Sequence, residues 1–101
     1  MAQFDVYENK NSRTKEDIPY LLDIQNNMLK ELSTRAVVPL VLNMKPAKIL
    51  NPKFEINGLN LTMSTAELAG VSMDNLGTCI CSLEDKRDEI ISAIDFMITG
   101  F

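Results

Sequence analysis

An Asn-Gly pair at positions 57 and 58 separates two segments, 54–56 and 59–63, in which apolar and polar residues alternate. Alternation with a period of two is typical of a strand with one buried face. Asparagine and glycine both tolerate positive φ, which the two-residue type I′ turn between twisted antiparallel strands requires. The sequence therefore predicts a β-hairpin over residues 54–63, in a fold that contains antiparallel sheet.

Further segments favour strands before and after this hairpin. Residues 4–7 alternate between apolar and polar types, and residues 20–25 and 34–42 are rich in apolar and β-branched types. A last short strand is predicted over residues 77–81. Pro39 cannot donate a ladder hydrogen bond, so the strand over 34–42 should be bulged or have an unpaired side at that position.

Three polar or weakly patterned segments connect these strands. Residues 8–17 can bury almost nothing, which predicts an exposed connection. Residues 26–33 fit either a loop or one helical turn, and residues 65–71 fit a short turn. The chain has neither a secretory signal pattern nor an apolar run near the roughly 18–20 residues of a membrane span, so we expect a cytoplasmic protein.

The hydrophobic period changes after residue 82. Ser82 is a candidate helix cap, and Asp85 three residues later approximates a capping box. Apolar residues then recur at helical spacing as far as Gly100, with charged residues on the opposite side. Several antiparallel strands followed by one amphipathic helix predict an α+β domain over residues 1–101, built on a strongly bent sheet or partial barrel.

Composition limits the chemistry that this domain can perform. The 101 residues carry a net charge of −4, which disfavours direct binding to a nucleic-acid backbone. Histidine is absent, which excludes Ser-His-Asp and Cys-His catalysis and removes the usual imidazole metal ligands. Cys79 and Cys81 have no further soft ligands, so we expect reduced structural thiols, no metal and no cofactor. A domain of this size buries little of its surface, which favours a homodimer.

The unusual chemistry lies at the end of the helix, which finishes with an aromatic residue. Free helix carbonyls, the chain-terminal carboxylate and Asp95 concentrate acceptors there, where a partner arginine could meet them and Phe101 could add apolar contact. Two other interpretations stay open: residues 96–98 could belong to the core or a dimer contact, and Phe101 could fold back onto the sheet. Met63 and Met97 are candidates for packing across a homodimer interface.

Taken together, the segments of the chain resemble the CcdB toxins of plasmid and chromosomal toxin–antitoxin modules. The resemblance spans the whole length and rests on the order of four segments, Gln3-Phe4-Asp5-Val6-Tyr7, Leu22-Asp23-Ile24-Gln25, Arg35-Ala36-Val37-Val38-Pro39-Leu40 and Ala93-Ile94-Asp95-Phe96-Met97-Ile98-Thr99-Gly100-Phe101. It implies a homodimer, an SH3-like partly open barrel and a C-terminal helix near the dimer axis. It also implies a topoisomerase poison that traps the cleaved-DNA intermediate on the A subunit of DNA gyrase, and not an enzyme.

The resemblance also implies roles for particular residues. The main determinants of gyrase binding fall on the last three residues, and neighbouring contacts fall on four others: Thr99, Gly100, Phe101, Asp95, Ile98, Asn26 and Met28. A cognate CcdA-like antitoxin would neutralise the toxin by covering an overlapping surface, with Tyr7 and Arg13 contributing. The best-known member has tryptophan where this chain has Thr99, so a large stacking contact is missing. Two alternatives stay open: an endoribonuclease toxin of the same fold, and a degenerate non-toxic relative that only binds an antitoxin.

Overall fold

The computed structural model describes residues 2–29 and 31–100. Its strands are β1 (Asp5–Asn9), β2 (Tyr20–Asp23), β3 (Thr34–Val41), β4 (Lys53–Ile56), β5 (Leu59–Met63), β6 (Ala69–Ser72) and β7 (Leu76–Ser82). The long helix is α1 (Arg87–Thr99), and the short 3-10 turns are η1 (Asn27–Leu29), η2 (Thr65–Glu67), η3 (Met73–Asn75) and η4 (Glu84–Lys86).

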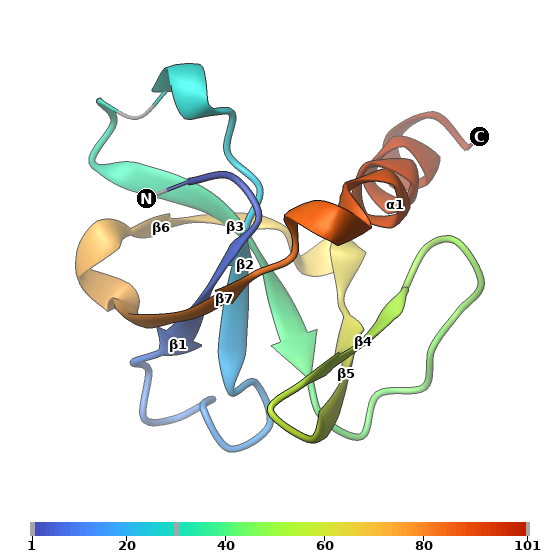
Figure 1. Cartoon of the computed structure of the whole chain (residues 1–101), viewed down its shortest axis with the longest axis horizontal. Coiled ribbons are helices and arrows are strands. Elements are labelled where there is room, and N and C mark those ends of the chain that lie inside the picture. Colours follow the sequence, from blue (N-terminus) through green and yellow to red (C-terminus); the bar gives the residue numbers. More distant parts are fainter. Residues whose placement is uncertain (1, 30, 101) are drawn as a thin grey trace.

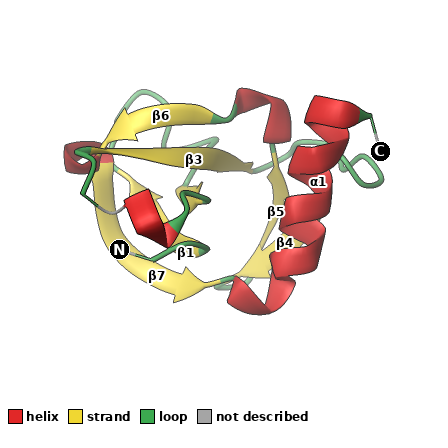
Figure 2. Cartoon of the chain, turned by 90° about the horizontal axis from the view of Figure 1, so that it is seen from above, coloured by secondary structure: helices red, strands yellow, loops and turns green. Residues whose placement is uncertain are grey.

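The strands form one antiparallel sheet in the order β4-β5-β3-β2-β1-β7, and β6 pairs with β3 outside this path. The sheet curls strongly, and α1 follows β7 at the end of the chain (Figure 1). Viewed from above, the curled strands surround the interior and α1 lies on its open side (Figure 2). The expected α+β fold, a bent antiparallel partial barrel with a C-terminal helix, is confirmed.

The core lies between the inner face of this sheet and one side of α1. Ile90 and Ala93 of the helix are fully buried and belong to one cluster with inward-facing strand residues such as Val6, Leu22 and Leu61. A smaller second cluster lies on the other face of β1, β2 and β3 and contains Tyr7, Leu21, Val37 and Leu76. Alternation along each strand produces the two clusters, because successive side chains point to opposite faces.

The predicted hairpin is confirmed. Ile56 of β4 pairs with Leu59 of β5, and the two residues between them, Asn57 and Gly58, have φ values of 51° and 80°. Two successive positive φ values are the requirement of the type I′ turn.

Pro39 occupies the position expected of a residue that has no backbone N–H to donate. On one side of β3, β6 pairs with residues 34–37 and β5 pairs with residues 40 and 41. Pro39 lies between these two ladders, where β3 changes its outer partner, and the Ser64 N–H donates to its carbonyl at 2.9 Å. The predicted unpaired side is therefore confirmed, and it marks the point where the sheet divides.

Several boundaries differ from the sequence-based expectation. Strand β6 was expected to be a turn, because its four residues show no apolar alternation and three of them are exposed. The α-helix begins at Arg87 and not after Ser82, since the Ser82 hydroxyl accepts the Glu84 N–H at 3.2 Å and a 3-10 turn follows. The first strand begins at Asp5, because Phe4 has a φ of 73°. The segment 26–33 contains one helical turn, η1.

Candidate partner-binding site

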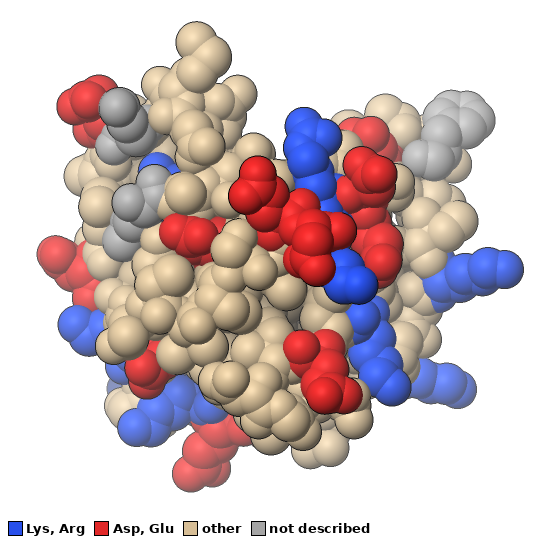
Figure 3. All heavy atoms as spheres, viewed as in Figure 1, with Lys and Arg blue, Asp and Glu red and all other residues tan. Residues whose placement is uncertain are grey.

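The C-terminal half of α1 projects from the core toward solvent. Its buried side ends with Ala93, while Phe96 and Met97 are only half-buried and Ile98 is 71% exposed. Asp95 is exposed and lies three residues before Ile98, on the same side of the helix. Acidic and basic side chains gather over α1 and the neighbouring loop (Figure 3). An isoleucine that a folded chain leaves this exposed at a helix end is free to contact a partner.

The last turn of α1 is held by two hydrogen bonds. Gly100 has a φ of 80°, and its N–H donates to the Phe96 carbonyl at 2.9 Å. The Thr99 hydroxyl donates to the Asp95 carbonyl at 2.7 Å. One of the helix carbonyls that we expected to face a partner arginine, that of Phe96, is therefore already occupied. The Asp95 side-chain carboxylate, at the negative end of the helix dipole, makes no ion pair with any residue of 2–29 and 31–100.

The structure brings four of the seven predicted gyrase contacts to this end of α1: Asp95, Ile98, Thr99 and Gly100, all of them exposed. Phe101 lies outside the described residues. The other two, Asn26 and Met28, belong to the segment that contains η1, and this segment lies away from the helix end (Figure 1). A single chain therefore presents two separate surfaces.

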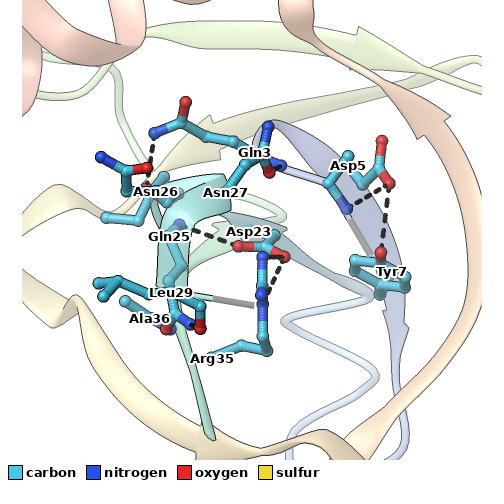
Figure 4. Close-up of polar contacts among 12 residues, drawn as sticks. Gln3, Asp5, Tyr7, Asp23, Gln25, Asn26, Asn27, Leu29, Arg35 and Ala36 are labelled. Atoms are coloured by element: carbon cyan, nitrogen blue, oxygen red, sulfur yellow. Dashed lines mark hydrogen bonds and ion pairs between the residues drawn. The ribbon is translucent and has the colours of Figure 1, made fainter. Parts of the chain in front are cut away.

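The surface at η1 has its own supporting network. Arg35 on β3 and Asp23 on β2 form an ion pair with both side chains buried, at 2.9 Å from Nε and 2.6 Å from Nη2 to the same carboxylate oxygen (Figure 4). The Gln25 N–H donates to the other carboxylate oxygen of Asp23 at 2.9 Å. Burial raises the pKa of the Asp23 carboxyl, while the Gln25 N–H and Arg35 act in the opposite direction.

Hydrogen bonds of Gln25 connect this network to the 3-10 turn η1. Its side-chain nitrogen donates to the Leu29 carbonyl at 3.0 Å, and its oxygen accepts the Ala36 N–H at 2.9 Å. The Gln3 N–H donates to the Asn27 side chain at 2.8 Å (Figure 4). Met28, 87% exposed, is thus an apolar side chain on a turn fixed by buried polar groups.

The two predicted antitoxin contacts occupy different environments. Tyr7 is only 4% exposed, and its hydroxyl donates to the Asp5 carboxylate at 3.2 Å. Burial first, and then the charge of Asp5, raises the pKa of Tyr7 to about 12. Arg13 is exposed in the turn before β2, with its N–H donating to the Asn11 side chain at 3.0 Å. Of these two residues, therefore, only Arg13 has a side chain that a partner could contact on the surface of the single chain.

The structure also shows where the predicted dimer contacts and the two thiols lie. Met63 is fully buried opposite Leu40, so the single chain leaves it no surface for a partner, whereas Met97 is half-buried on α1. Cys79 is exposed and Cys81 is half-buried, both are free, and burial raises the pKa of each thiol. Residues 2–29 and 31–100 contain no group of three or more acidic or thiol side chains that could hold a metal ion.

The sequence did not point to the buried polar network. Arg35 was counted as one residue of an apolar strand, and Asp23 and Gln25 as parts of another. The available signal was a charged residue inside an otherwise apolar, β-branched segment, because an isolated charge there needs a buried partner.

Comparison with known proteins places this geometry in a family. The family model described as "CcdB protein" matches residues 3–100. An endoribonuclease in complex with its cognate antitoxin, from mycobacterial species, superposes with a TM-score of 0.78 at 13% identity, covering 97% of this chain and 94% of that one. A second mycobacterial endoribonuclease gives a TM-score of 0.75 at 14% identity, covering 97% and 90%. Among curated proteins, no sequence matches the chain significantly.

These structures correct one expectation. We expected a chain that is not an enzyme. That expectation is wrong for this fold, because the two similar structures named above are endoribonucleases. In the described part of the chain, no helix has the length and apolar character needed to cross a membrane. With a family model that covers residues 3–100 and the matching curled sheet and terminal helix, the chain belongs to the CcdB family, the toxins of toxin–antitoxin modules.

Proposed function

We propose that this chain acts as a toxin by binding the A subunit of DNA gyrase with the end of α1 and trapping the cleaved-DNA intermediate. The observation that carries the proposal is the pairing of Ile98, 71% exposed, with the exposed Asp95 carboxylate at the negative end of the helix. Such a tip fits a partner surface that offers an arginine beside apolar side chains. This role places the protein in the cytoplasm, where gyrase acts.

Gyrase-dependent cleavage of plasmid DNA by the purified chain tests this proposal. Ile98→Ser should lower the potency about tenfold, because an apolar anchor at an interface centre contributes about 1–2 kcal/mol. Asp95→Arg should lower it further, since it places a cation against the expected arginine. Leu59→Ser and Asp74→Arg, which make comparable changes at other exposed positions, serve as matched controls. Full cleavage by Ile98→Ser and by a chain that lacks residues 99–101 contradicts the proposal.

A cognate antitoxin is the second proposed partner. The family membership and the antitoxin in one of the similar structures support it. Exposed Arg13 is the candidate contact, and Tyr7 would act from beneath the surface. Co-expression of the cognate antitoxin should restore growth, and Arg13→Glu should weaken that rescue. If the antitoxin rescues growth equally well with Arg13→Glu, Arg13 is not a contact of the antitoxin.

We propose a homodimer that uses the half-buried side of α1 around Met97. Sedimentation should give twice the mass of the chain, and Met97→Asp should shift the protein toward the monomer. An unshifted mass for Met97→Asp would place the interface elsewhere.

A second candidate function is cleavage of RNA, which the two endoribonuclease structures favour. Since the chain has no histidine, proton transfer in such an enzyme would fall to carboxylate, arginine or hydroxyl side chains. Incubation of the purified chain with RNA, without gyrase, separates the two functions. Specific RNA cleavage supports this candidate, and harmless overexpression of a folded chain contradicts both and favours a degenerate, antitoxin-binding relative.

A further inference from the structure

A cleft of about 480 Å³ lies between α1 and the loop that joins β3 to β4. One wall consists of the loop residues around Lys48 and Ile49, and the other of Asp88, Glu89 and Ser92 on α1. None of these lining residues is among those that we assign to gyrase. The volume falls in the range of about 300–1,000 Å³ typical of binding sites.

The loop wall is held in an unusual conformation. The Leu50 N–H donates to the Lys48 carbonyl at 2.9 Å, which closes a three-residue turn around Ile49, and Ile49 has a φ of 70°. A β-branched residue in this region is strained, and a γ-turn with positive φ is the rarer form. The buried hydroxyl of Thr65 donates to the Leu50 carbonyl and fixes the turn from below.

This conformation keeps an apolar side chain at the rim of the cleft. Ile49 is 51% exposed, although an isoleucine gains nothing by facing water. The strained backbone of Ile49 is maintained by the hydrogen bond from the Thr65 hydroxyl, and it holds an exposed apolar side chain. Backbone strain that is kept in this way points to a functional contact.

The charges of the two walls are opposite. Lys48 and Lys53 lie on the loop side and Asp88 and Glu89 on the helix side, and Figure 3 shows basic and acidic side chains meeting over this region. Within the described residues the one ion pair is that of Asp23 with Arg35, so the four charges do not pair with one another. They remain available for an occupant that carries both signs.

The helix wall follows the axis of α1. Asp88 and Ser92 are separated by four residues, so they lie one turn apart along one exposed stripe of α1. An elongated occupant fits this arrangement better than a compact small molecule, because it can follow the stripe.

We propose that the cleft is a docking site for a peptide segment of a partner protein. The segment places one aliphatic or aromatic side chain against Ile49, an acidic residue near Lys48 and Lys53, and a basic residue near Asp88 and Glu89. This inference goes beyond the gyrase proposal, because it uses other residues and needs no contact with the helix end.

Selection of displayed random 12-residue peptides on the immobilised full chain tests the proposal. The enriched peptides should share an apolar residue with acidic and basic residues on its two sides. Fluorescence anisotropy with the most enriched peptide should show at least tenfold weaker binding to Ile49→Asn, since asparagine tolerates positive φ but removes the apolar contact. Lys48→Glu with Lys53→Glu should weaken binding equally, and Lys45→Glu, on the same loop outside the cleft, should not.

The outcomes separate this proposal from the gyrase proposal. Ile49→Asn should keep full gyrase-dependent DNA cleavage, and Ile98→Ser should keep full peptide binding. Thermal denaturation of each variant verifies the fold. Three outcomes would overturn the proposal. The enriched peptides could bind Ile49→Asn as tightly as the natural chain, or Ile98→Ser could weaken their binding. The chain could also associate with itself through this cleft.

Discussion

The guanidinium of Arg35 and the carboxylate of Asp23 form an ion pair with relative side-chain exposures of 1% and 0%. Together with Gln25 they join β2, β3 and the turn η1 through hydrogen bonds, of which the two to Asp23 are buried. Replacing one partner therefore leaves the other as a buried charge without compensation.

Arg35→Met should lower the free energy of unfolding by about 3–5 kcal/mol, because Asp23 remains buried and unpaired. Urea denaturation followed by circular dichroism measures this loss. Arg13→Met, the same change at an exposed arginine, should alter stability by less than about 0.5 kcal/mol. The double variant Asp23→Leu, Arg35→Met should recover much of the loss, and equal instability of the single and double variants would count against an electrostatic origin.

Tyr7 should make stability depend on pH in the alkaline range. Its pKa is raised from 10.0 to about 12 in the folded chain. Between these values the unfolded tyrosine loses its proton while the folded one keeps it, so the free energy of unfolding should fall as pH rises from about 10 to about 12. Tyr7→Phe should flatten this fall in urea midpoints measured across the range. Tyr20→Phe is the control, and an unchanged slope in Tyr7→Phe would contradict the assignment.

Gly100→Ala should destabilise the end of α1. Gly100 has a φ of 80° and nothing within 4 Å of an added Cβ, so the cost is conformational, about 1 kcal/mol. Gly70→Ala offers a matched control, since its surroundings are equally open and its φ is not positive. We expect Gly70→Ala to be neutral or slightly stabilising in thermal denaturation. Equal effects of the two substitutions would show that the left-handed cap is unimportant.

Ile49→Asn should leave the chain at least as stable as the natural one. Asparagine tolerates the left-handed φ, and the half-exposed Ile49 side chain loses little burial, so we expect a gain of up to about 1 kcal/mol. Ile98→Asn, the same change in a regular helix, should give no such gain. The melting temperatures of both variants decide the matter, and a clear loss for Ile49→Asn would contradict the strain at this turn.

Local pattern was sufficient for the parts of the fold that depend on neighbouring residues. The Asn57-Gly58 turn, the unpaired side of Pro39 and the end of the helix at Gly100 each follow from the backbone preferences of one or two residues. The helix start was misplaced, because the Ser82 side chain binds the N–H of a 3-10 turn and the α-helix begins five residues later.

Features that depend on contacts between residues far apart in the sequence could not be predicted from local patterns. Strand β6 forms because β3 offers a free edge before Pro39, and its own residues carry no strand pattern. Met63 was a candidate surface residue, and only the packing of β5 against β3 shows that it is buried. At the candidate site, the helix pattern counted Ile98 among the apolar positions, and the coordinates were needed to show that it is 71% exposed and that the Thr99 hydroxyl donates to the Asp95 carbonyl.

The pairing of β1 with β7 joins residues near opposite ends of the chain. A ribosome must therefore synthesise β7, about 70 residues after β1, before this ladder can close and the helix that follows it can pack on the core. Contacts of such high sequence separation slow folding, because a long loop must close first. A chain that stops before β7 accordingly lacks this ladder, and the end of α1 takes its place only after β7 has paired with β1.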